Sequence, residues 1–110
     1  YELDKKYYGD AVEHSDLIRY EWARIPHFYT SYYVYKYATG ITTAVSIANN
    51  ILTKGEKYFE KYRQFLSAGG SLPPLDIIRL ADVDLESDAP YKTAMKEFAD
   101  TLDELEKSFE

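Results

Sequence analysis

The chain has 110 residues, no cysteine, and a formal net charge of -6 from 13 basic and 19 acidic side chains. Its length suits one domain with a modest core, and the lack of cysteine excludes disulfides and thiolate zinc ligands, so we expect a reducing, cytoplasmic location. The acidic balance argues against nucleic acid or an anionic membrane as the main partner. No apolar run approaches the roughly 20 residues that span a bilayer.

The first part of the chain contains two predicted helical pieces. Residues 1–8 are consistent with the tail of a helix that stops at Gly9, and residues 17–23 predict a short helical turn before Pro26. The chain starts YELDKKYYGD without an initiating methionine, so we expect it to be a piece of something longer.

A core helix is predicted over residues 41–52, and it should run back into the tyrosine-rich stretch before it. Its apolar residues have the spacing of one helix face and should point to the core: Ile41, Ala44, Val45, Ala48, Ile51 and Leu52. The polar residues should lie largely on the other face: Thr42, Thr43, Ser46, Asn49 and Asn50.

Three further helices are predicted after a break at Gly55. The first covers residues 58–66 and ends at Gly69 and Gly70, and the second starts at the prolines of SLPPLDIIRLAD, with Leu75, Ile78 and Leu80 facing inward.

The last helix is long, with a charged outer face. Its apolar residues are spaced 4, 3, 4, 3, 4, as in a seam that packs along another helix: Tyr91, Met95, Phe98, Leu102, Leu105 and Phe109. With no convincing strand, the fold class is all-α: about four helices, in a single segment over residues 1–110.

The sequence does not contain a recognisable metal or phosphate site. A catalytic zinc needs about three protein ligands at set spacing, but His14 and His27 are the only histidines and no H-E-x-x-H is present. Gly69 and Gly70 lack the following lysine of a phosphate loop, so we interpret them as a helix stop. We therefore expect this segment to bind no metal.

Five tyrosines lie between His27 and Tyr37. If the chain is helical from Phe28 onward, Tyr29 and Tyr32 share one face, which Tyr35 continues. Tyr33 and Tyr37 share a neighbouring face. One interpretation is a core of aromatic rings, each needing one hydrogen bond for its hydroxyl. The other is the wall of a site, because a phenol stays neutral near pH 7 and can donate to a developing negative charge.

Four segments of the chain form a specific pattern: YYGDAV at 7–12, WARIPHFYTSYYVYKYATG at 22–40, FLSAGGS at 65–71 and PLDIIRLADVDL at 74–85. Together they resemble the C-terminal region of the oligoendopeptidase F family, zinc oligopeptidases related more distantly to thimet oligopeptidase. The resemblance extends from about Leu3 to Lys107, and its central run is the most specific part. Asp82 stands where the family usually has glycine, and we expect the turn to persist because aspartate tolerates a left-handed backbone.

The resemblance implies a metalloendopeptidase that hydrolyses short oligopeptides, with its H-E-x-x-H zinc site upstream of Tyr1. This segment would line the cleft opposite the metal. His27, Tyr32 and Tyr35 would be the catalytic donors to the oxyanion, and His27, Tyr29 and Tyr32 would bind the substrate backbone. Tyr33 and Tyr37 would belong to the core.

The partners implied by this reading are the oligopeptide substrate and the remainder of the peptidase chain. Alone, the segment should be inactive and should self-associate through the aromatic stretch or the terminal seam, since large apolar patches seldom stay bare. The alternative is a free-standing helical interaction module that binds a partner through its aromatic face.

Overall fold

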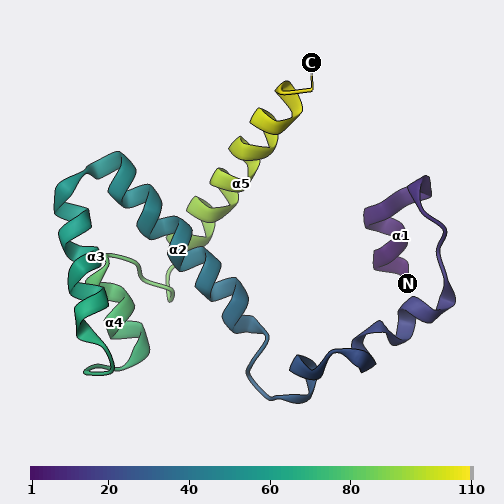
Figure 1. Ribbon diagram of the computed structural model, residues 1–110, viewed down its shortest axis with the longest axis horizontal. Coiled ribbons are helices and arrows are strands. Elements are labelled where there is room, and N and C mark those ends of the chain that lie inside the picture. Colours follow the sequence, from purple (N-terminus) through teal and green to yellow (C-terminus); the bar gives the residue numbers. More distant parts are fainter. Residues whose placement is uncertain (110) are drawn as a thin grey trace. The chain divides into compact units, whose positions relative to one another are not determined.

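The computed structural model describes residues 1–109 and contains no strand among them, so the all-α prediction is confirmed (Figure 1). Five α-helices are described instead of about four: α1 Glu2–Tyr8, α2 Tyr35–Lys54, α3 Glu56–Ala68, α4 Pro74–Leu80 and α5 Ala89–Lys107. Three 3₁₀ helices lie between α1 and α2: η1 Gly9–Ala11, η2 Asp16–Arg24 and η3 Pro26–Tyr29. The chain divides into two compact units, residues 1–36 and residues 37 onward.

The first unit consists of short helices whose ends follow the predicted signals. The helix α1 stops at Gly9, which has a φ of 54° and can adopt this left-handed backbone without a steric penalty. The hydroxyl of Ser15 caps η2 by accepting a hydrogen bond from the Leu17 N–H at 3.2 Å. Both helical pieces predicted for this part of the chain are therefore confirmed, the second as a 3₁₀ helix.

His14 connects α1 to the segment that follows it. Its Nδ1 lies 2.6 Å from the Asp4 carboxylate and its Nε2 lies 2.6 Å from the Gly9 carbonyl oxygen. Since both partners are acceptors, the ring satisfies both only when both nitrogens carry a proton. The Asp4 carboxylate, with the Gly9 carbonyl, accordingly raises the pKa of His14 above its ordinary value.

This geometry predicts that α1 is more stable in mildly acidic solution. The pKa is raised in the folded state, so the stabilisation is present below the ordinary histidine pKa and is lost as pH rises through the raised value. Amide hydrogen exchange in α1 should therefore become faster, relative to the intrinsic rate, as pH increases above about 6.5. His14→Ala should abolish this dependence, and its persistence in that variant would contradict the assignment.

The second unit follows the predicted helix boundaries closely. Gly55, with a φ of 78°, separates α2 from α3, and Gly69, with a φ of 54°, ends α3. Pro74 occupies the first turn of α4, where its missing N–H costs no intrahelical hydrogen bond. The second unit has a small apolar core, which lies where α2, α3 and α4 meet the segment after α4. Its buried residues are Ile47, Ala81 and Val83, and five half-buried residues pack against them: Ile51, Tyr62, Phe65, Ile78 and Leu85.

The predicted orientation of α2 is wrong for four of its six apolar residues, whereas Ile51 packs against the core as predicted. Thr42 and Ser46 are each only 5% exposed, whereas Ile41 is 63% and Leu52 84% exposed. The polar face is buried because it meets the start of α5: the Ser46 hydroxyl donates to the Pro90 carbonyl oxygen at 3.4 Å. The Asn49 amide likewise donates to a Glu97 carboxylate at 2.5 Å. These hydrogen bonds compensate the polar groups for their lost water.

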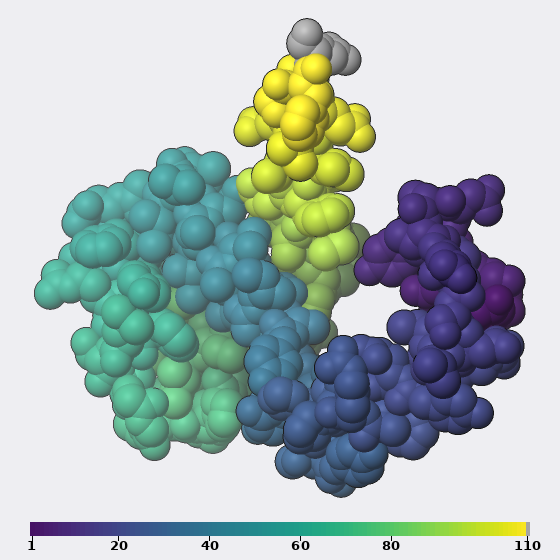
Figure 2. All heavy atoms as spheres, turned by 45° about the vertical axis from the view of Figure 1, so that its right-hand side comes forward, coloured from purple at the N-terminus to yellow at the C-terminus, as the bar shows by residue number. Residues whose placement is uncertain are grey.

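The predicted seam of α5 also does not pack on a helix among residues 1–109. The buried residues of α5 are Pro90 and Ala94, while Met95 is 64% and Phe109 82% exposed. Figures 1 and 2 show the last turns of α5 extending beyond the other helices of its unit. Self-association through this seam stays a prediction. Sedimentation velocity at increasing protein concentration tests it by measuring the oligomeric state.

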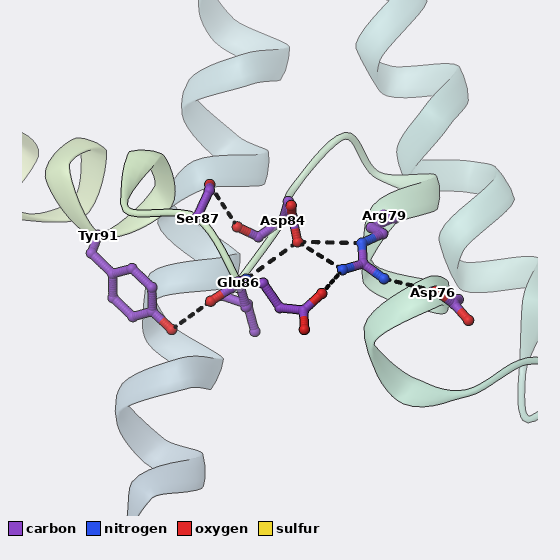
Figure 3. A network of polar contacts seen from close by, with 7 residues as sticks. Asp76, Arg79, Asp84, Glu86, Ser87 and Tyr91 are labelled. Atoms are coloured by element: carbon purple, nitrogen blue, oxygen red, sulfur yellow. Dashed lines mark hydrogen bonds and ion pairs between the residues drawn. The ribbon is translucent and has the colours of Figure 1, made fainter.

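An ion-pair network holds α4 to the loop that precedes α5 (Figure 3). The Arg79 guanidinium donates to Asp76 at 2.8 Å, to Asp84 at 3.1 Å, and to Glu86. The Tyr91 hydroxyl donates to the Leu85 carbonyl oxygen at 3.2 Å. The arginine therefore bridges three carboxylates, and this fixes the path of the loop more than it adds stability, since the groups are partly solvated.

The turn after α4 has the predicted left-handed residue. Asp82 has a φ of 62°, and its carboxylate pairs with the Lys61 ammonium at 2.6 Å, which lowers the carboxyl pKa.

We expect Asp82→Gly to be about 0.5 to 1 kcal/mol more stable than Asp82→Ala, because alanine is strained in a left-handed backbone and glycine is not. Both variants lose the ion pair, so chemical denaturation of the two isolates the backbone effect. An alanine variant as stable as the glycine variant would contradict it.

Candidate functional site

The segment between residues 25 and 36 is not a continuous helix, so the condition under which Tyr29 and Tyr32 would share a helix face is not met. Pro26 starts η3, which ends at Tyr29, and Thr30 then has an extended backbone. Tyr32 has a φ of 55°, and α2 begins only at Tyr35. The predicted spacing of Tyr29 and Tyr32 on one helix face is thereby lost.

Tyr32 is the most unusual residue of this segment. A left-handed φ is rare for a bulky aromatic residue, because its Cβ crowds the backbone, and such strain is concentrated at functional sites. Tyr32 is 86% exposed, so contacts with the rest of residues 1–109 do not bury the ring and do not offset the strain.

Tyr29 is fixed by a hydrogen bond inside the first unit. Its hydroxyl donates to the Ala23 carbonyl oxygen at 2.7 Å, which closes the chain from the end of η2 to the end of η3. The proton of this phenol is therefore already donated, while Tyr29 itself is 67% exposed. Tyr29 can accept a hydrogen bond without any rearrangement, whereas donating one requires that the Ala23 bond break.

The His27 imidazole stacks on the ring of Tyr33, with centroids 5.3 Å apart and an angle of 27° between the planes. The Lys36 ammonium lies 5.2 Å from the centroid of the same tyrosine ring. Tyr33 is half-buried and stacks against His27, a contact that the sequence reasoning missed. Only its position six residues after His27 could have suggested it.

The four predicted site residues are all exposed: His27, Tyr29, Tyr32 and Tyr35. Tyr35 is the first residue of α2 and is 58% exposed, as is Tyr37, which therefore does not lie in a core of the described residues. The segment presents a series of ring hydroxyls and an imidazole that a ligand can reach.

Zinc does not fit the residues described. Among residues 1–109, no group of three or more histidine, cysteine or carboxylate side chains is placed to hold a metal ion. The same part of the chain lacks a helix long and apolar enough to cross a membrane.

Comparison with known proteins gives the family. The sequence profile of Peptidase family M3 matches residues 1–97. The chain is 45% identical over 107 residues to Oligopeptidase PepF of Bacillus subtilis, covering 97% of this chain and 16% of that protein. It is 43% identical over 109 residues to the plasmid Oligoendopeptidase F of Lactococcus lactis subsp. cremoris, covering 99% and 18%.

A third relative, Group B oligopeptidase PepB of Streptococcus agalactiae, is 45% identical over 105 residues, or 96% of this chain and 18% of that protein. No solved structure matches the chain. The chain spans less than a fifth of the length of these curated relatives. With a profile match over 97 of its 110 residues, the chain belongs to Peptidase family M3.

Proposed function

We propose that this chain is part of a zinc-dependent oligoendopeptidase and lines the cleft that binds short peptides. The single observation that carries the assignment to this segment is Tyr32, a strained and 86% exposed tyrosine beside three other exposed candidate donors. The names of the relatives, Oligopeptidase PepF and Oligoendopeptidase F, support the reaction class. Zinc ligands would lie outside these residues, because the described ones do not form a metal site.

In this proposal the side chains act as donors and acceptors of hydrogen bonds. Tyr32 and Tyr35 donate to the oxygen on which negative charge develops when a peptide carbonyl is attacked. A well-placed donor of this kind contributes about 3 kcal/mol to the transition state.

His27 and Tyr29 have complementary roles. The imidazole of His27, held by its stacking on Tyr33, donates from a ring nitrogen to the same developing oxyanion and also contacts the substrate backbone. Tyr29 accepts from a substrate N–H, because its own proton is bound to the Ala23 carbonyl. Tyr29 therefore contributes to substrate binding more than to stabilising the oxyanion.

The proposal predicts that the 110-residue chain, even with added zinc, does not hydrolyse peptides, because residues 1–109 do not form a metal site. A chimera in which this chain replaces the matching segment of Bacillus subtilis Oligopeptidase PepF should hydrolyse a fluorogenic heptapeptide and lose this activity with a chelator. The 45% identity over 107 residues favours folding of the graft. Chelator-sensitive hydrolysis by the chain alone would contradict the proposal.

A further inference from the structure

The helix α2 exposes an apolar stripe. Ile41, Ala44, Ala48 and Leu52 follow the spacing of one helix face, and all four are exposed. Ile41 is 63% and Leu52 84% exposed, although they are the large members of the set. We call these four residues the α2 stripe.

The other side of the same helix is polar and buried. Thr42, Thr43 and Ser46 are at most 9% exposed, and the side chains of Thr43 and Ser46 donate to backbone carbonyls. A surface helix normally has the reverse arrangement, with its apolar side covered and its polar side in water. An apolar stripe left in solvent usually marks a surface that contacts something else.

We propose that the α2 stripe is a docking surface for the part of a full-length oligoendopeptidase that lies outside these 110 residues. The inference rests on the proposed function, which places the chain in such an enzyme. More than 80% of each relative lies outside the match, since the chain spans 16% of one and 18% of another. That much additional chain can cover a stripe three turns long.

The shape of the stripe indicates what covers it. Ala44 and Ala48 are small and lie between the larger Ile41 and Leu52, so a partner helix can approach closely at the centre and insert a large apolar side chain. None of the four residues is charged, so the partner surface should be apolar as well.

A second copy of this chain is the competing occupant of the stripe. The labelling experiment distinguishes the two, because a second copy would protect the stripe in the chain alone, and this protection would increase with concentration.

Cysteine labelling tests this proposal directly, because the chain contains no native cysteine. Leu52→Cys and Ala48→Cys should react with a maleimide roughly tenfold or more slowly in the chimera than in the chain alone, when measured by peptide mass spectrometry. The matched control is Thr53→Cys, an exposed neighbour on another side of the helix, whose rate should stay within about twofold.

Two labelling outcomes would overturn the proposal. Equal rates for Leu52→Cys in the chain and in the chimera would mean that the remainder does not cover the stripe. Protection in the chain alone that increases with its concentration would instead assign the stripe to a second copy.

A second variant avoids dependence on labelling. Ala48→Lys should leave the melting temperature of the chain alone unchanged and should lower that of the chimera by several degrees. Thr53→Lys should affect neither protein, and an unchanged chimera with Ala48→Lys would overturn the proposal.

The same chimera separates this proposal from the proposed function. A chimera that protects Leu52→Cys and does not cleave peptides would support docking and contradict the peptidase role. A chimera that cleaves peptides and leaves Leu52→Cys fully reactive would support the peptidase role and contradict docking.

Discussion

Replacing His27 by alanine in the chimera should lower kcat for a short peptide by about 100-fold to 1,000-fold, with a smaller change in KM. This loss corresponds to removing one donor that acts mainly in the transition state. Steady-state kinetics with a fluorogenic heptapeptide measure it. An unchanged melting temperature would show that the exposed ring is not needed for folding.

Tyr32→Phe should likewise lower kcat more than it changes KM, because it removes only the hydroxyl that donates to the oxyanion. Tyr20→Phe is the matched control, because Tyr20 is 66% exposed in η2 and lies outside the proposed site. Equal kcat values for these two phenylalanine variants would contradict the role of Tyr32.

Tyr32→Gly should stabilise the chain slightly, because glycine accepts the left-handed backbone, and should abolish the catalytic contribution of the side chain.

Ile47→Ala should lower the free energy of unfolding of the second unit by about 2 to 4 kcal/mol. Ile47 is 6% exposed and packs with Ala81 and Val83, so its truncation leaves a cavity in a small core. A core of this size contains few other apolar contacts to compensate.

Ile41→Ala provides a control of the same residue type on the same helix. Ile41 is 63% exposed, so the change in the chain alone should stay within about 0.5 kcal/mol. Urea denaturation followed by circular dichroism compares the two variants. Equal destabilisation would contradict the observed orientation of α2.

Much of the candidate site was predictable from the pattern of residues, but its geometry was not. The segment at 22–40 identified the region of interest, and the four predicted site residues are exposed. Their arrangement on helix faces was wrong because Pro26 starts a short 3₁₀ helix and Tyr32 is left-handed, which a spacing argument cannot detect. The stacking of His27 on Tyr33 depends on this same irregular backbone.

Several helix ends follow from local chemistry, and for these the sequence alone was sufficient. Gly9, Gly55 and Gly69 accept positive φ values, Pro74 suits a first turn, and Asp82 tolerates the turn that it occupies. The similarity to Peptidase family M3 is likewise a property of the residue order.

Which face of α2 and of α5 is buried was settled only by tertiary packing, whereas Tyr62, Phe65 and Ile78 of α3 and α4 pack against the core as their spacing predicted. Periodicity placed Ile41 inside and Ser46 outside, yet the start of α5 meets the polar side of α2 and satisfies its hydrogen bonds. Periodicity reports how a helix divides its residues between faces. Contacts between segments distant in sequence decide which face meets protein and which meets water, since burial depends on the partner that each face finds.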